Sequence, residues 1–176
     1  MLGGITHHTM PRKAEDIITK NDEYGAYTGL GLSLILRTLR EGVATLSEPE
    51  RCFLGVYQLH TNVNNGGFYG FFTNTSGDFA ASALAGLQAV GAPQIHGLLT
   101  RACSVFPGGV VPPTQGEREL FLQDSPRGDK WADLDKPNRF QLFFEPLDKE
   151  FYSSPERLSA LAVAYARQHI ADFRVE

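Results

Sequence analysis

The chain has 176 residues, of which 42% are hydrophobic and 11% aromatic, enough apolar material for one packed domain of ordinary size. Charged residues make up only 20%, which excludes a highly charged disordered protein. The 16 basic and 20 acidic side chains give a net charge of −4, which excludes the basic surface of a nucleic-acid binder and is too mild for a polyanion.

The first thirteen residues lack the apolar stretch of a signal peptide, and no segment approaches the ~20 apolar residues of a membrane span. We therefore expect a cytoplasmic protein with no membrane partner. We expect residues 1–12 to form a flexible N-terminus and residues 13–176 a single helical domain. Cys52 and Cys103 lie in apolar helical contexts, which favours buried free thiols.

Helix signals begin with residues 30–42, which end at Gly42 and place four apolar side chains on one stripe: Leu32, Ile35, Leu36 and Leu39. A capping box from Ser47 to Glu50, with a proline in the first turn, predicts a helix that runs to about Asn64.

Further helices follow in the second half of the chain. Asp78 is the expected N-cap of a helix over residues 79–90, which Gly91 ends. Pro93 begins the next helix, and a Gly/Pro-rich loop follows it. The last three predicted helices lie over residues 114–122, capped by Thr114, over residues 138–145, and from about Ser154 onward.

Strand signals are poor, because no segment alternates between apolar and polar residues for long. The predicted fold class is therefore all-α, a compact multi-helix domain. The alternative is an α+β fold with one short strand pair, in which residues 140–144 form a strand.

One segment, residues 57–78, combines glycines, aromatic residues and amides. Two interpretations stay open for it. In the first, the glycines redirect the chain while the aromatic side chains fill the core and the asparagines bond freed backbone groups. In the second, a polar notch binds a small ligand or a partner side chain. The candidate notch consists of His60, Asn64, Asn65, Gly66, Gly67, Phe68, Asn74 and Asp78.

Signals for catalysis are weak. No paired histidine motif, phosphate-binding loop or buried acid pair is present, so we expect no metal, no cofactor and no catalytic residues. Ser76, His60 and Asp78 could be combined into a triad, but Ser76 does not lie in a nucleophile-elbow motif.

The order of several motifs resembles a bacterial DNA-mimic protein family of unknown function. These motifs are NNGGFYGFFTNTSGD, then ALAGLQAVGA, FPGGVVPP and ERELFL, within a family-like region of about residues 44–173. The resemblance implies an all-helical domain, often a homodimer. For the best-known member it implies an acidic surface that occupies the DNA-binding face of a partner protein.

The charges of this chain depart from that pattern, because lysines alternate with acids in its last third. The acids are Asp133, Asp135, Asp148 and Glu150, and the lysines among them are Lys130, Lys136 and Lys149. We expect a patchy acidic surface without a continuous ridge of phosphate-like charge. The sequence thus predicts a non-enzymatic protein-interaction module. The expected partner is a protein, either a DNA-binding protein or a second copy of the chain, and we expect no direct contact with nucleic acid. The alternative is a small-molecule binder or enzyme that uses the notch.

Overall fold

The computed structural model describes residues 13–123 and 138–175, and these residues form eight α-helices without a β-strand. The α-helices are α1 (Ala14–Lys20), α2 (Glu23–Glu41), α3 (Glu48–Thr73), α4 (Ala80–Val90), α5 (Pro93–Cys103), α6 (Gln115–Leu122), α7 (Arg139–Tyr152) and α8 (Leu158–Gln168). Short 3₁₀ helices lie between or after them: η1 (Val43–Thr45), η2 (Thr75–Phe79), η3 (Pro107–Gly109) and η4 (Ile170–Asp172). The predicted all-α class is confirmed. The α+β alternative is wrong, because residues 140–144 lie within α7, where an Asn138 capping box starts a helix.

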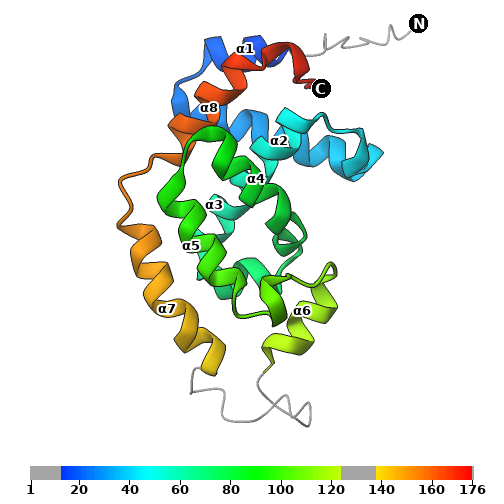
Figure 1. Ribbon diagram of the computed structural model, residues 1–176. Helices are drawn as coiled ribbons and strands as arrows, with labels where there is room; N and C mark the ends of the chain where they lie inside the picture. The colour runs from blue at the N-terminus through cyan, green and yellow to red at the C-terminus, as the bar shows by residue number, and fades with distance from the viewer. Residues whose placement is uncertain (1–12, 124–137, 176) are drawn as a thin grey trace, which may run out of the picture.

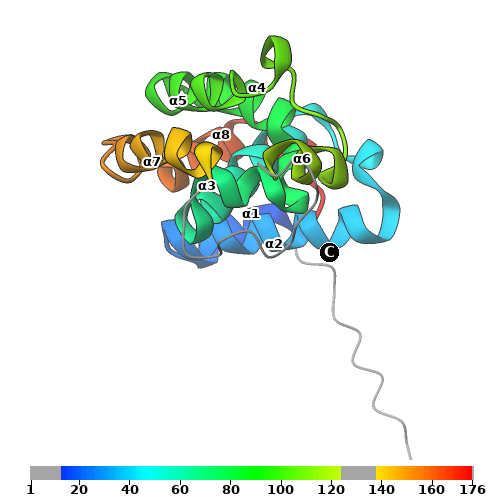
Figure 2. The same ribbon diagram turned by 90° about the horizontal axis from the view of Figure 1, so that it is seen from below.

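The long helix α3 lies at the centre of the fold. Helices α1 and α2 lie on one side of it and α4 and α5 on the other (Figure 2). Helices α1 and α8 lie at one end of the molecule, and α6 and α7 at the opposite end (Figure 1). None of the helices in the described ranges is both long and apolar enough to cross a membrane.

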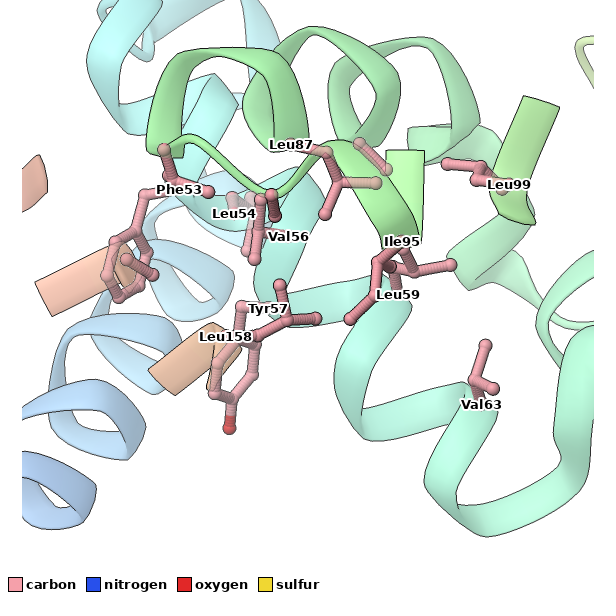
Figure 3. Close-up of a cluster of buried hydrophobic side chains, with 14 of the residues drawn as sticks. Phe53, Leu54, Val56, Tyr57, Leu59, Val63, Leu87, Ile95, Leu99 and Leu158 are labelled. Atoms are coloured by element: carbon pink, nitrogen blue, oxygen red, sulfur yellow. The ribbon is translucent and has the colours of Figure 1, made fainter. Parts of the chain in front are cut away.

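Helix α3 supplies much of the core because it is covered on several sides. Figure 3 shows its side chains from Phe53 to Val63 beside Leu87 of α4, Leu99 of α5 and Leu158 of α8. Helices α3 and α4 approach each other closely through Gly55 and Gly86. A Cβ atom at either glycine would collide with the backbone of the facing helix. Cys52 and Cys103 are free and buried, as predicted.

Local capping signals set several helix ends as predicted. Ser47 and Glu50 form a capping box at the start of α3, and Thr114 and Glu117 form one at the start of α6. Gly91 ends α4 in the left-handed conformation.

The predicted N-cap at Asp78 is wrong. The N-cap of α4 is Phe79, and its side chain makes no capping hydrogen bond. Residues 75–79 form the 3₁₀ helix η2, which leads directly into α4. The Asp78 carboxylate instead accepts a hydrogen bond from Arg118 of α6.

Helix α2 begins at Glu23, seven residues earlier than predicted, and buries the face opposite the apolar stripe. Of the predicted stripe, Leu32, Leu36 and Leu39 are exposed and Ile35 is partly buried against the core, whereas Tyr27 and Leu34 on the opposite face are fully buried. An apolar stripe usually marks the buried side of a helix. Here the buried side also carries Gly31, which receives the Tyr57 ring, and Arg37, which pairs with Glu50. Hydrophobic periodicity cannot predict that Gly31 and Arg37 are buried, because neither has an apolar side chain. The leucine stripe is therefore left at the surface.

Candidate functional site

The predicted end of a helix near Asn64 is a kink, and the helix continues to Thr73. Gly66 (φ −151°) and Gly67 (φ 64°) have non-helical backbone angles inside α3. A Cβ atom at Gly67 would be strained by the positive φ and would collide with the Asp148 carboxylate of α7. The two glycines therefore bend α3 and let α7 pack directly against the bend.

Helix α7 holds the kink through two hydrogen bonds. The Phe68 amide donates to Oδ1 of Asp148 at 2.8 Å, and the Tyr152 hydroxyl donates to the Val63 carbonyl at 2.8 Å. Both backbone groups lie at the kink, where the regular helical ladder is interrupted. Burial, together with the neighbouring Glu145 carboxylate, raises the pKa of Asp148 even though the Phe68 amide stabilises the charged form.

Aromatic side chains beyond the kink enter the core, as predicted. Phe68, Phe71 and Phe72 are fully buried. The Phe68 ring packs against the rings of Phe144 and Phe151 of α7, with centroids 6.3 and 5.8 Å apart. These contacts make the Asn-Gly-Gly-Phe turn part of the packing between α3 and α7.

Polar residues of the notch that precede the kink are bound within the fold or lie in solvent. His60 Nδ1 lies 3.2 Å from the Tyr27 hydroxyl, and burial lowers the His60 pKa, so the ring is neutral near pH 7. The Asn64 amide donates to the His60 carbonyl at 2.7 Å. Asn65 is exposed.

Asn74 and Asp78 belong to a second cluster around the Arg118 guanidinium, which is fully buried. Arg118 donates to the carbonyls of Phe72 (2.8 Å), Asn74 (2.9 Å) and Pro112 (3.0 Å), and to Oδ1 of Asp78 (2.6 Å). One side chain of α6 thereby fixes the end of α3 and the loop before α6. The structure therefore does not bring the eight notch residues together: Asn74 and Asp78 belong to the Arg118 cluster, and the others lie at the kink or before it.

A second arginine–carboxylate pair, buried on both sides, joins α2 to the start of α3. Arg37 of α2 pairs with Glu50 of α3, and Glu50 also accepts from the backbone amides of Arg174 (2.6 Å) and Ser47 (2.7 Å). Burial opposes ionisation of Glu50, but these donors outweigh it and lower its pKa. Sequence reasoning missed this pair and Arg118, because a lone arginine in an amphipathic helix usually lies in solvent.

Groups that could perform catalysis are occupied by other contacts. Ser76 donates to the Phe71 carbonyl, so the three members of the considered triad have separate partners. Burial raises the pKa of Cys52, and that of Cys103 to about 11, so neither thiol is a ready nucleophile at neutral pH. Within the described ranges, no group of three or more His, Cys, Asp or Glu side chains could hold a metal ion.

A groove of about 550 Å³ lies at the surface between α2, α3 and η2. Its apolar walls come from five side chains: Ile35, Leu39, Val43, Leu54 and Phe79. Asp78 lines this groove, but the other seven notch residues do not. This apolar groove is therefore separate from most of the predicted notch, and the exposed leucines of α2 lie in it or beside it.

Carboxylates in the described residues are largely balanced by nearby cations or by helix ends. At least six lie within 4 Å of a lysine or arginine nitrogen: Asp16, Glu23, Glu50, Asp78, Glu145 and Glu150. Glu156 instead accepts from two backbone amides at the start of α5. Asp133 and Asp135 lie outside the described residues.

These observations define an all-helical protein. Its central helix is kinked, two arginines are buried, and an apolar groove lies at its surface. Residues 44–169 match the family of DMP19-like proteins, so the chain belongs to that family. The resemblance to the DNA-mimic family is thereby confirmed over nearly the whole predicted region. No curated protein and no solved structure matches the chain.

Proposed function

We propose that this protein is a non-enzymatic protein-interaction module whose partner is a DNA-binding protein, and that it occupies the DNA-binding face of that partner. The observation that carries the proposal is membership of the DMP19-like family over residues 44–169. Fold alone does not determine function, so the chemistry of the described residues must also agree with it.

The state of the notch residues supports a role without catalysis. His60 contacts Tyr27, Asp78 contacts Arg118, and Asp148 holds the Phe68 amide. Each of these groups already stabilises the fold. A reaction would have to displace them from contacts that the core requires.

The balance of charge bears on how the partner is bound. A DNA mimic that relied on charge alone would need rows of unopposed carboxylates at phosphate-like spacing. In the described residues many carboxylates have a cation beside them, for example Glu150 beside Arg101 at 2.7 Å. Such neighbouring pairs cancel most of each other's field beyond the ~8 Å Debye length of physiological salt. Apolar contacts must then contribute a substantial share of the affinity.

Affinity capture from an extract of the native host tests the proposal. The full chain is immobilised, and the extract is applied with and without an excess of duplex DNA. We expect a captured protein that has a DNA-binding domain and is lost when duplex DNA is present. The proposal fails if the captured proteins lack such a domain, if duplex DNA leaves the capture unchanged, or if nothing is captured.

A further inference from the structure

Apolar side chains are concentrated on the outer face of α2 and on η1. Leu32, Leu36 and Leu39 are 55%, 50% and 77% exposed, and Val43 is 45% exposed. Their successive separations are four, three and four residues. The three leucines fall on one face of α2 and span seven residues, or about 10 Å of helix.

The groove between α2, α3 and η2 continues this stripe. Leu39 and Val43 belong to both the stripe and the groove, and Leu54 and Phe79 line the groove from α3 and η2. Leu32 and Leu36 lie outside the groove, further along α2, so the stripe and the groove together form an elongated surface. An elongated apolar surface beside a groove suits an extended macromolecular segment better than a compact small molecule.

The spacings of four and three residues between the leucines of α2 are those of one seam of a pair of packed helices. Val43 lies beyond Gly42 (φ 87°), outside α2, and extends the apolar surface but not the helical face. Exposed apolar residues at these spacings fit the apolar seam of another helix, which lays its own side chains between them. The occupant with the matching periodicity is therefore an amphipathic helix.

Charge further restricts that helix. Arg51 and Asp78 are the two ionisable side chains that line the groove. Asp78 already pairs with Arg118 at 2.6 Å, whereas Arg51 uses Nη1 on the Leu46 carbonyl and forms no ion pair with another residue of the described ranges. A helix with a carboxylate near Arg51 complements this arrangement.

We propose that the leucine stripe of α2 and the adjoining groove bind an amphipathic helix of the partner protein, with a carboxylate of that helix at Arg51. This inference rests on the proposed function in that the helix belongs to the same partner. The inference adds which surface of this protein binds the partner, and that the bound segment of the partner is an amphipathic helix.

Two matched variants test the surface. Leu39→Asp places a charge in the stripe, and Leu120→Asp places the same charge on α6, where Leu120 is 75% exposed. Both positions are exposed, so both variants should fold, which circular dichroism and thermal melting verify. We expect Leu39→Asp to weaken binding of the captured partner at least about tenfold, and Leu120→Asp to leave it within about twofold. Equal binding of the partner by both variants would overturn the proposal that the stripe and groove bind it, and would leave the proposed function intact.

A peptide assay tests the groove without the natural partner. The probe is a fluorescein-labelled amphipathic peptide of about 18 residues, with leucines spaced four and three apart and glutamates beside them. A second peptide of the same composition has its leucines at alternate positions. We expect binding of the first peptide only, its loss in Leu39→Asp, and a preference for a lysine-substituted version in Arg51→Glu. No binding, or equal binding of both peptides, refutes the proposal.

A second copy of the chain is the competing occupant. Sedimentation velocity over a range of concentrations decides this point. A dimer that Leu39→Asp dissociates and Leu120→Asp does not would assign the stripe to self-association and overturn the proposal. If capture yields no DNA-binding partner, the proposed function fails, and the peptide assay alone then decides the groove.

Discussion

Replacing Arg118 with methionine should destabilise the fold strongly, because this fully buried guanidinium donates four hydrogen bonds that join α6 to the end of α3, to η2 and to the loop before α6. Methionine has an unbranched apolar side chain, shorter than that of arginine, and no hydrogen-bond donors. The Phe72 carbonyl would lose its Arg118 donor, and a buried acceptor without a partner costs about 1–3 kcal/mol. The Asn74 carbonyl keeps the Gly77 amide as a donor, so losing Arg118 there costs less. The Asp78 side chain is 47% exposed and can be solvated, so its loss adds little.

These contributions give a decrease in the free energy of unfolding of about 3 kcal/mol. For a chain of this size, the melting temperature should then fall by about 6–12 °C. Urea denaturation followed by circular dichroism measures the free energy directly. Arg101→Met is the matched control, because the Arg101–Glu150 pair is about half exposed and should contribute only about 0–1 kcal/mol. Equal effects of the two substitutions, or a loss below about 1 kcal/mol for Arg118→Met, would refute the reasoning.

Three further predictions concern the kink and the aromatic core. Gly67→Val should lower the free energy of unfolding by at least about 1–3 kcal/mol, because Gly67 has a positive φ and its Cβ position meets Asp148. Gly66→Ala is the control and should cost about 1 kcal/mol or less, because the space at its Cβ position is open. Equal melting temperatures for the two variants would contradict this prediction. Phe72→Ala should cost about 3–5 kcal/mol in urea denaturation, and a loss below about 1 kcal/mol would exclude a packed ring. Because the folded-state pKa of Asp148 is raised, its ionisation opposes folding at neutral pH, and this penalty is relieved as pH falls through that pKa. Asp148→Asn keeps an oxygen acceptor for the kink, so it should match or exceed the parent in stability at pH 7. This advantage should shrink as the pH approaches 4, and a variant that is less stable at pH 7 but not at pH 4 would contradict the assignment.

Local signals were sufficient where a helix end depends on residues close in sequence. The capping boxes at Ser47 and Thr114 and the glycine stop at Gly91 lie where the sequence predicts them. The family resemblance could also be recognised from the single sequence, because it depends on the order of short motifs. The glycine and aromatic residues of these motifs form the kink and part of the core.

Long-range partners account for the errors. Asp78 has the residue type and position of an N-cap, but Arg118, forty residues later, takes its carboxylate. The apolar stripe of α2 indicates a buried face only if Arg37 is assumed to lie in solvent, and its partner Glu50 is thirteen residues away on another helix. A pattern of apolar and polar residues contains no information on such pairings.

The candidate site was predictable only in part. The Gly66–Gly67 bend and the buried aromatic side chains follow from residue type, but the division of the notch between two clusters depends on the packing of α6 and α7. The groove was not predictable, because its leucines look like core residues in the sequence.

Competition with duplex DNA for the purified partner tests the central claim most directly. A fluorescein-labelled duplex is bound to the partner, and its anisotropy is followed as this protein is added at several salt concentrations. We predict full displacement of the duplex, with an affinity for the partner that falls less steeply with salt than the affinity of the duplex does, because apolar contacts supply part of the binding. A ternary complex, in which the duplex stays bound while this protein binds the same partner, would contradict the claim.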